Sequence, residues 1–188
     1  MPILGIISSG ISGNLAPAAG YYSLATSTVG SGGAAYVEFT NISNQYKHLQ
    51  IRISARDTRG VAANWALMEF NSDTNSNYSD HMLFADGTSV TSGYDLDSKI
   101  WIFTQPGSTA TANYFNAAIV DILDYSNLNK FKTVRALAGF QRGGAGQAGL
   151  IGANWRSTNA ISSIKIYPAI TGSWAQYSKF SLYGISNG

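Results

Sequence analysis

Apolar and polar residues alternate along much of the chain from Val37 onward, and this alternation predicts β-strands. The clearest case is the segment 48–56, in which Leu49, Ile51, Ile53 and Ala55 alternate with polar or charged residues. A period of two turns one row of side chains toward a core and the other toward solvent. We therefore predict a half-buried strand in this segment.

The segment 115–123 is apolar on both of its alternating rows, except for Asn116 and Asp121. Such a segment is typical of a strand covered on both faces for most of its length, so we predict a central strand. Seven further strands are predicted at 35–40, 64–71, 99–104, 131–140, 148–154, 161–167 and 179–185.

Turn-forming residues separate these segments, and no convincing amphipathic helix and no internal repeat interrupts them. About eight to ten short strands predict an all-β fold, an antiparallel β-sandwich. A jelly roll is the preferred form, because eight strands in two packed sheets suit a chain of 188 residues. We predict one such domain, covering residues 34–188.

Composition narrows the class of protein. Charged residues make up only 12% of the chain and hydrophobic residues 45%, so a disordered, highly charged chain is excluded. The net charge of +2 is far below the clustered basic excess that phosphate binding needs, and we predict no nucleic-acid partner. The absence of cysteine excludes disulfides and thiolate metal sites.

The first charged residue is Glu38, and we predict that residues 1–33 form an extended N-terminal docking arm. The N-terminal segment lacks the basic residues of a signal peptide. Its apolar part, residues 3–15, is too short and polar to span a membrane, so no membrane partner is predicted. A frayed terminus is the alternative. Exposed aliphatic side chains promote aggregation unless something covers them, which favours docking onto this domain or a neighbour. The predicted assembly residues of the arm are Ile3, Leu4, Ile6, Ile7, Ile11 and Leu15.

The loop 71–77 carries oxygen-bearing side chains at alternate positions, as the start of a calcium-binding loop does. The glycine and the glutamate that such a loop requires are replaced by Ser76 and Met82. A hairpin loop built from Asx turns is the preferred interpretation. We predict no metal and no cofactor.

Two sets of residues are candidates for catalytic groups. Asp121 and Asp124 could pair as acid and base in a glycosidase, although strand-end and turn roles explain them better. His48 and His81 occur without the strand-turn-helix motif that presents a nucleophilic serine. We predict no catalytic residues and no enzymatic activity.

Trp155 is the best candidate for a ligand contact, because it lies between Asn154 and Arg156. An indole ring beside an amide and a guanidinium group can stack on a sugar and hydrogen-bond its hydroxyls. The alternative is that Trp155 fills the core of the sandwich. Asn154, Trp155 and Arg156 are thus a candidate glycan-binding site.

Several segments, spread in order over nearly the whole chain, together resemble virion proteins of tailed bacteriophages that are common among aquatic phages. These segments are 6–15, 46–52, 70–74, 120–125, 129–133, 155–161 and 180–185. The resemblance implies a virion structural protein, either a capsid decoration (cement) protein or a tail-fibre-like component. It carries no catalytic residues.

The arm and the resemblance together lead to the preferred hypothesis. The chain is expected to be a non-enzymatic, self-associating β-sandwich on the particle surface, assembled as a homotrimer and docked through its arm onto major capsid or tail proteins. It would lie in the virion, and in the host cytoplasm during assembly. The alternative is a tail-fibre adhesin that binds host surface glycans.

Overall fold

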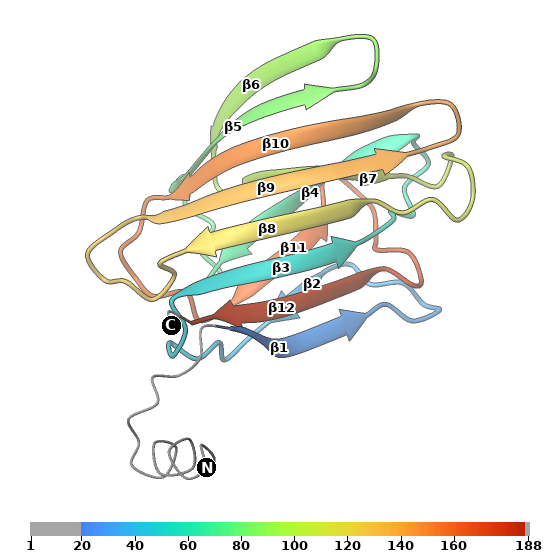
Figure 1. The fold of residues 1–188 in the computed structure, drawn as a ribbon. Coiled ribbons are helices and arrows are strands. Elements are labelled where there is room, and N and C mark those ends of the chain that lie inside the picture. Colours follow the sequence, from blue (N-terminus) through green and yellow to red (C-terminus); the bar gives the residue numbers. More distant parts are fainter. Residues whose placement is uncertain (1–19, 187–188) are drawn as a thin grey trace, which may run out of the picture.

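The computed structural model describes residues 20–186, which form twelve β-strands and no helix. The strands make two antiparallel sheets, one of eight strands and one of four (Figure 1). In spatial order the eight-stranded sheet consists of β1 (Tyr21–Thr28), β12 (Lys179–Ile185), β3 (His48–Ser54), β8 (Ala117–Leu123), β9 (Lys132–Gln141), β10 (Gly146–Trp155), β5 (Tyr78–Ala85) and β6 (Val90–Asp97).

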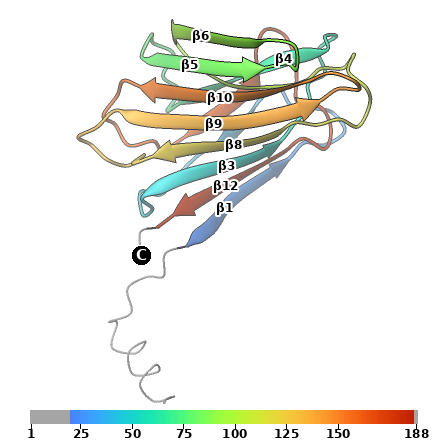
Figure 2. The same cartoon turned by 45° about the horizontal axis from the view of Figure 1, so that its top comes forward.

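The four-stranded sheet lies against one face of the larger sheet. Its spatial order is β2 (Val37–Phe39), β11 (Ile164–Pro168), β4 (Ala63–Phe70) and β7 (Ile100–Pro106). Figure 2 shows the eight strands side by side from β1 to β6, with the smaller sheet behind them. The chain is therefore an all-β sandwich with sheets of unequal width. Among residues 20–186 there is no helix long and apolar enough to cross a bilayer.

The core lies between the two sheets and is built by the alternation that the sequence displays. In β3, Leu49, Ile51 and Ile53 are at most 5% exposed, and β8 contributes Val120 and Ile122, which are fully buried. The opposite sheet supplies Met68, Phe70, Ile100, Ile164 and Ile166 among others. Burial of these side chains is the main term that favours folding.

All nine predicted strands are present, with ends shifted by a few residues. Three strands were not predicted: β1, β5 and β6. In β5 the buried row includes Asp80 while Leu83 is half exposed. Strand β6 exposes side chains on both faces because little of the four-stranded sheet reaches over it. Neither segment shows the simple alternation of a half-buried strand. The jelly-roll topology stays a prediction.

The predicted arm, residues 1–33, overlaps the sandwich. Strand β1 pairs with β12 from Tyr21 to Thr28, with a bulge between Ser23 and Ala25, and Val29 is buried. Residues from 21 onward are thus part of the folded domain. The predicted assembly residues Ile3, Leu4, Ile6, Ile7, Ile11 and Leu15 lie outside the described residues, so their role stays a prediction.

The prediction that strand 115–123 is covered on both faces is wrong for this chain. Strand β8 is central in the sheet order, yet Ile119 and Leu123 are 41% and 42% exposed. The reason is that the four-stranded sheet packs on one face of the larger sheet only. The other face, here called the outer face, has no covering layer among the described residues.

Candidate interaction surface

The outer face carries a row of exposed aliphatic side chains that crosses four neighbouring strands. Ile119 of β8 lies opposite Leu137 of β9, Leu137 opposite Leu150 of β10, and Leu150 opposite Leu83 of β5. They are 41 to 60% exposed. Directly opposed residues of adjacent strands have neighbouring side chains, so these four residues, the aliphatic row, form one continuous ridge.

A second row, two residues away along each strand, is made of small side chains. Ala117 of β8 lies opposite Gly139 of β9, Gly139 opposite Ala148 of β10, and Ala148 opposite Ala85 of β5. Residues two apart on a strand face the same side. This small-residue row therefore forms a trough beside the ridge of the aliphatic row.

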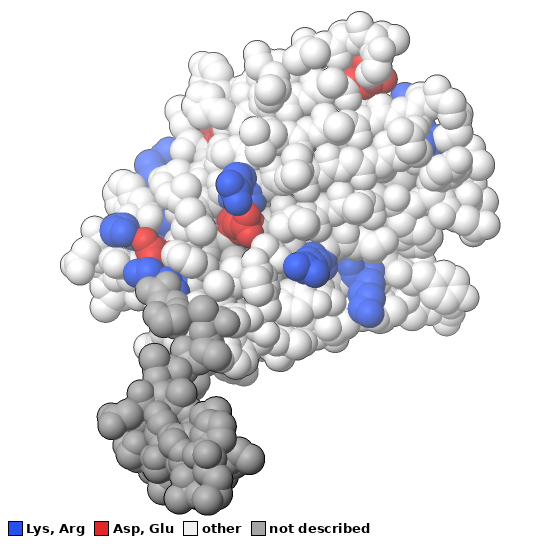
Figure 3. Space-filling view, viewed as in Figure 1, with Lys and Arg blue, Asp and Glu red and all other residues white. Residues whose placement is uncertain are grey.

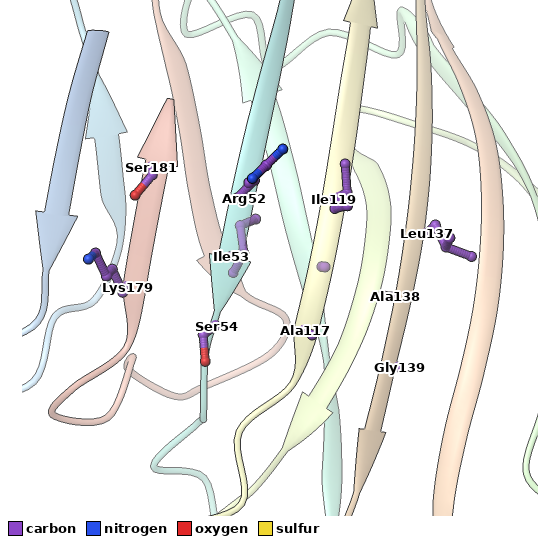
Figure 4. A pocket seen from close by; sticks show the side chains of 11 residues that line it. Arg52, Ile53, Ser54, Ala117, Ile119, Leu137, Ala138, Gly139, Lys179 and Ser181 are labelled. Carbon is purple, nitrogen blue, oxygen red and sulfur yellow. The ribbon is translucent and has the colours of Figure 1, made fainter. Parts of the chain in front are cut away.

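A hollow of about 650 Å³ includes part of this trough. Figure 4 shows Ile119 and Leu137 toward one end of the hollow, with Ala117 and Gly139 on the same two strands toward the other. Arg52, Ser54, Lys179 and Ser181 line its side toward β3 and β12. A second hollow, of about 470 Å³, includes Leu83, Leu150 and Tyr94. The outer face is thus ridged and hollowed, with mainly apolar walls.

Charges on the outer face are few and partly paired. Figure 3, which views this face, shows a few charged side chains, some of them in contact with one another, on a surface that is otherwise uncharged. Arg135 forms an ion pair with Asp121 on the neighbouring strand, at 2.7 Å. The other Asp121 oxygen accepts a hydrogen bond from Gln50, whose side-chain oxygen accepts one from Arg52. This polar network borders the aliphatic row and leaves the row itself uncharged.

The structure places Trp155 in the core. Its side chain is 2% exposed, and its ring lies near those of Phe70 and Tyr78, with centroids 5.6 and 6.3 Å away. Arg156 is exposed and donates to the backbone oxygens of Ser76 and Tyr78, while Asn154 is half-buried. No face of the indole ring is exposed for stacking on a sugar, so the core role explains Trp155.

The loop 71–77 is held by its own hydrogen bonds. Asp73 accepts from the backbone and side chain of Asn75, from the side chain of Asn77 and from the indole nitrogen of Trp155. Burial alone would raise the pKa of Asp73, but these hydrogen bonds lower it to about 2. Within residues 20–186 no three carboxylate or imidazole groups are arranged to hold a metal ion. The contact between Asp73 and Asn75 is the Asx turn that the sequence suggested.

Both aspartates of the candidate acid and base pair form ion pairs with basic side chains. Asp121 pairs with Arg135, and Asp124 lies 2.7 Å from Lys130 and 2.9 Å from Lys47. Hydrogen bonds from Lys130 and Lys47 lower the pKa of Asp124 to about 2. Asp124 also donates its backbone N–H to His48. A carboxyl with so low a pKa is ionised at neutral pH and is unsuited to act as a general acid.

One buried carboxylate, that of Asp80, lies on β5, next to the edge strand β6. Asp80 is 1% exposed, and its Oδ2 accepts a hydrogen bond from the backbone of Trp101, whereas its Oδ1 has no partner among the described residues. Burial, together with the charges of Asp95 and Asp97, raises the pKa of Asp80 to about 6. His81 opposes this shift. We therefore expect the ionisation of Asp80 to make the stability of the fold depend on pH.

Comparisons with protein-family models, with curated proteins and with solved structures find no match to this chain. The arrangement of the outer face therefore carries the functional argument. Sequence reasoning missed this surface, although one signal was present. The double apolar pattern of residues 115–123 indicates a second apolar face, but the pattern alone does not distinguish a face covered within the chain from an exposed one.

Proposed function

We propose that the protein is a non-enzymatic structural component of a bacteriophage particle, a β-sandwich that associates with copies of itself on the particle surface. The observation that carries the proposal is the aliphatic row, whose four side chains lie together on the outer face of a sheet. Contiguous exposed apolar patches on soluble proteins mark interaction surfaces. The resemblance to tailed-phage virion proteins suggests that the particle is that of a bacteriophage.

The scarcity of charge supports the same proposal. Protein–protein contacts are depleted in charged residues at their centres, and polar groups gather at the rim. On the outer face the aliphatic row occupies the centre, and the network of Asp121, Arg135 and Gln50 borders it. The proposed partners are other copies of the chain and the major capsid or tail proteins. The homotrimer stays a prediction that the resemblance and the arm suggest.

Labelled particles test the proposed function. An antibody against the folded domain is bound to purified phage particles that encode the protein, and the particles are imaged. Label over the shell is the result for a cement protein, and label at the tail is the result for a tail-associated component. Particles without label, from which the protein is also absent by mass spectrometry, would contradict the proposal.

Deleting residues 2–15 tests the docking arm separately. We expect the shortened chain to keep the circular-dichroism spectrum of the sandwich, because the described strands begin at Tyr21, and to be lost from particles. Incorporation at the level of the full chain would show that docking does not need the arm.

A further inference from the structure

We propose that the outer face binds the same face of a second copy, related by a two-fold axis that runs across the strands between the aliphatic row and the small-residue row. This inference rests on the proposed function and deepens it, because it names one contact through which copies associate. A two-fold contact joins two copies, so it is separate from the contacts of the predicted homotrimer.

Shape favours this arrangement. A half-turn about such an axis places the aliphatic row of one copy over the small-residue row of the other, so that Leu137 of one copy meets Gly139 of the second. The register repeats this match along the rows: Ile119 meets Ala117, Leu150 meets Ala148 and Leu83 meets Ala85. A ridge that enters a trough gives the close packing that stable interfaces need.

The half-turn also keeps each cation from lying directly over its own copy. Arg52 continues the aliphatic row on β3, and Ser54 lies two residues further along the same strand. The proposed half-turn places Arg52 opposite Ser54 of the second copy, and Lys179 opposite Ser181. An axis along the aliphatic row itself would place Arg52 on Arg52 and each aliphatic side chain on its own copy. That alternative sets like charges and ridge tops against each other.

The twist of the sheet is compatible with the contact. A twisted sheet is saddle-shaped, and a half-turn about a line that crosses its strands maps the saddle onto itself. The two outer faces can therefore stay parallel along the whole row. Two sheets packed in this way lie about 10 Å apart, as in the core of a sandwich.

The area available fits a weak, self-complementary dimer. Six strands at a spacing of about 4.8 Å, over a band about 20 Å wide, offer roughly 600 Å² on each copy. Two copies would then bury about 1,200 Å², the lower limit of specific interfaces. Association is thus expected to depend on concentration and to strengthen when many copies gather on one particle.

Sedimentation equilibrium of the full chain tests the inference. We expect a monomer–dimer equilibrium whose dissociation constant rises at least about tenfold in Leu137→Asp, because a charge is placed in the apolar centre of the contact. The matched control is Leu128→Asp, since Leu128 is similarly exposed but lies in the loop after β8. The control is expected to dimerise like the wild type.

Cysteine cross-linking tests the geometry, because the chain has no cysteine of its own. A mixture of Leu137→Cys and Gly139→Cys chains should form mixed disulfide dimers in higher yield than either chain alone. A side chain at position 139 makes ordinary contacts, the nearest being the backbone oxygen of Gln147 at 3.4 Å, so this variant should fold. Circular dichroism checks the fold of both.

A chain that stays monomeric at every accessible concentration would overturn the inference. That is the result expected if the first nineteen residues covered the outer face instead. A dimer that Leu137→Asp leaves unchanged would overturn it too, and so would cross-linking that is strongest in Leu137→Cys alone. Each of these results leaves the proposed function open to its own test, because particle labelling reports incorporation by any surface.

Discussion

The two faces of strand β8 carry the same kinds of residue and meet opposite surroundings. Val120 and Ile122 are fully buried under the four-stranded sheet, whereas Ile119 and Leu123, on the same strand, are more than 40% exposed. The folding of one chain explains the first pair. It does not explain the second, because exposed aliphatic residues add no core and promote association. The difference supports our proposal that the outer face contacts another molecule, whereas the inner face stabilises the fold.

Replacing a large side chain of the inner face should have the largest effect on stability. Trp155→Ala removes a buried indole ring and is expected to lower the free energy of unfolding by about 3–5 kcal/mol in urea denaturation. Leu137→Ala, on the outer face, should cost less than about 1 kcal/mol when measured on the monomer. Equal losses would break the distinction between the two faces.

Lys132 and Arg135, three residues apart on β9, extend the comparison to cations. Lys132 is fully buried, and its ammonium group donates to the backbone oxygens of Asn127, Lys130 and Thr158. Lys132→Met should cost about 2–3 kcal/mol in the same assay, because buried acceptors lose a charged donor. Arg135→Met should cost less than about 1 kcal/mol, since its ion pair is exposed. A larger loss for Arg135→Met would contradict this ranking.

Asp80 should make the stability of the inner face depend on pH. Its pKa is raised from 3.8 to about 6 in the folded chain, so the folded state binds a proton that the unfolded state releases between these values. The free energy of unfolding therefore falls as pH rises from about 4 to about 6, by on the order of 2 kcal/mol for this group.

Asp80→Asn should remove that part of the pH dependence. Other carboxyl groups, such as Asp73 and Asp124, have the opposite effect on the free energy of unfolding. Their pKa values are lowered in the folded chain, so they make it rise as pH rises. The test is therefore the difference between variant and wild type in denaturation curves from pH 4 to pH 7. A difference that stays constant across this range would contradict the raised pKa of Asp80.

The smallest effect is expected for the ion pair that borders the aliphatic row. Asp121 and Arg135 are joined at 2.7 Å, but the side chain of Arg135 is 68% exposed. A double-mutant cycle with Asp121→Ala and Arg135→Ala should give a coupling energy below about 1 kcal/mol in the monomer. A larger value would mean that the outer face also contributes strongly to the stability of one chain.

Much of the fold could be predicted from the sequence, because alternation is a direct record of one buried and one exposed face. Residues 48–54 follow this rule and form β3. The rule failed where burial is not decided by a second layer. Strand β6 lies at the edge with both faces largely exposed, and in β5 a buried aspartate and an exposed leucine reverse the usual positions.

The pattern of residues 115–123 signals one strand with a second apolar face, but the aliphatic row as a whole could not be predicted, because it depends on register. Leu83, Ile119, Leu137 and Leu150 are far apart in the sequence, and only the pairing of four strands brings them into one row. The expected stacking role of Trp155 was wrong for a related reason. A tryptophan beside polar neighbours looks the same in sequence whether its ring points outward or, as Trp155 does, into the core.

Thiol labelling tests most directly whether the outer face becomes covered when copies associate. The full chain carrying Leu137→Cys is labelled with a thiol reagent in dilute and in concentrated solution, beside Leu128→Cys, where the replaced leucine is 66% exposed in a loop. We predict that labelling at position 137 slows as concentration rises while labelling at position 128 does not. Rates that are independent of concentration at both positions would contradict the account.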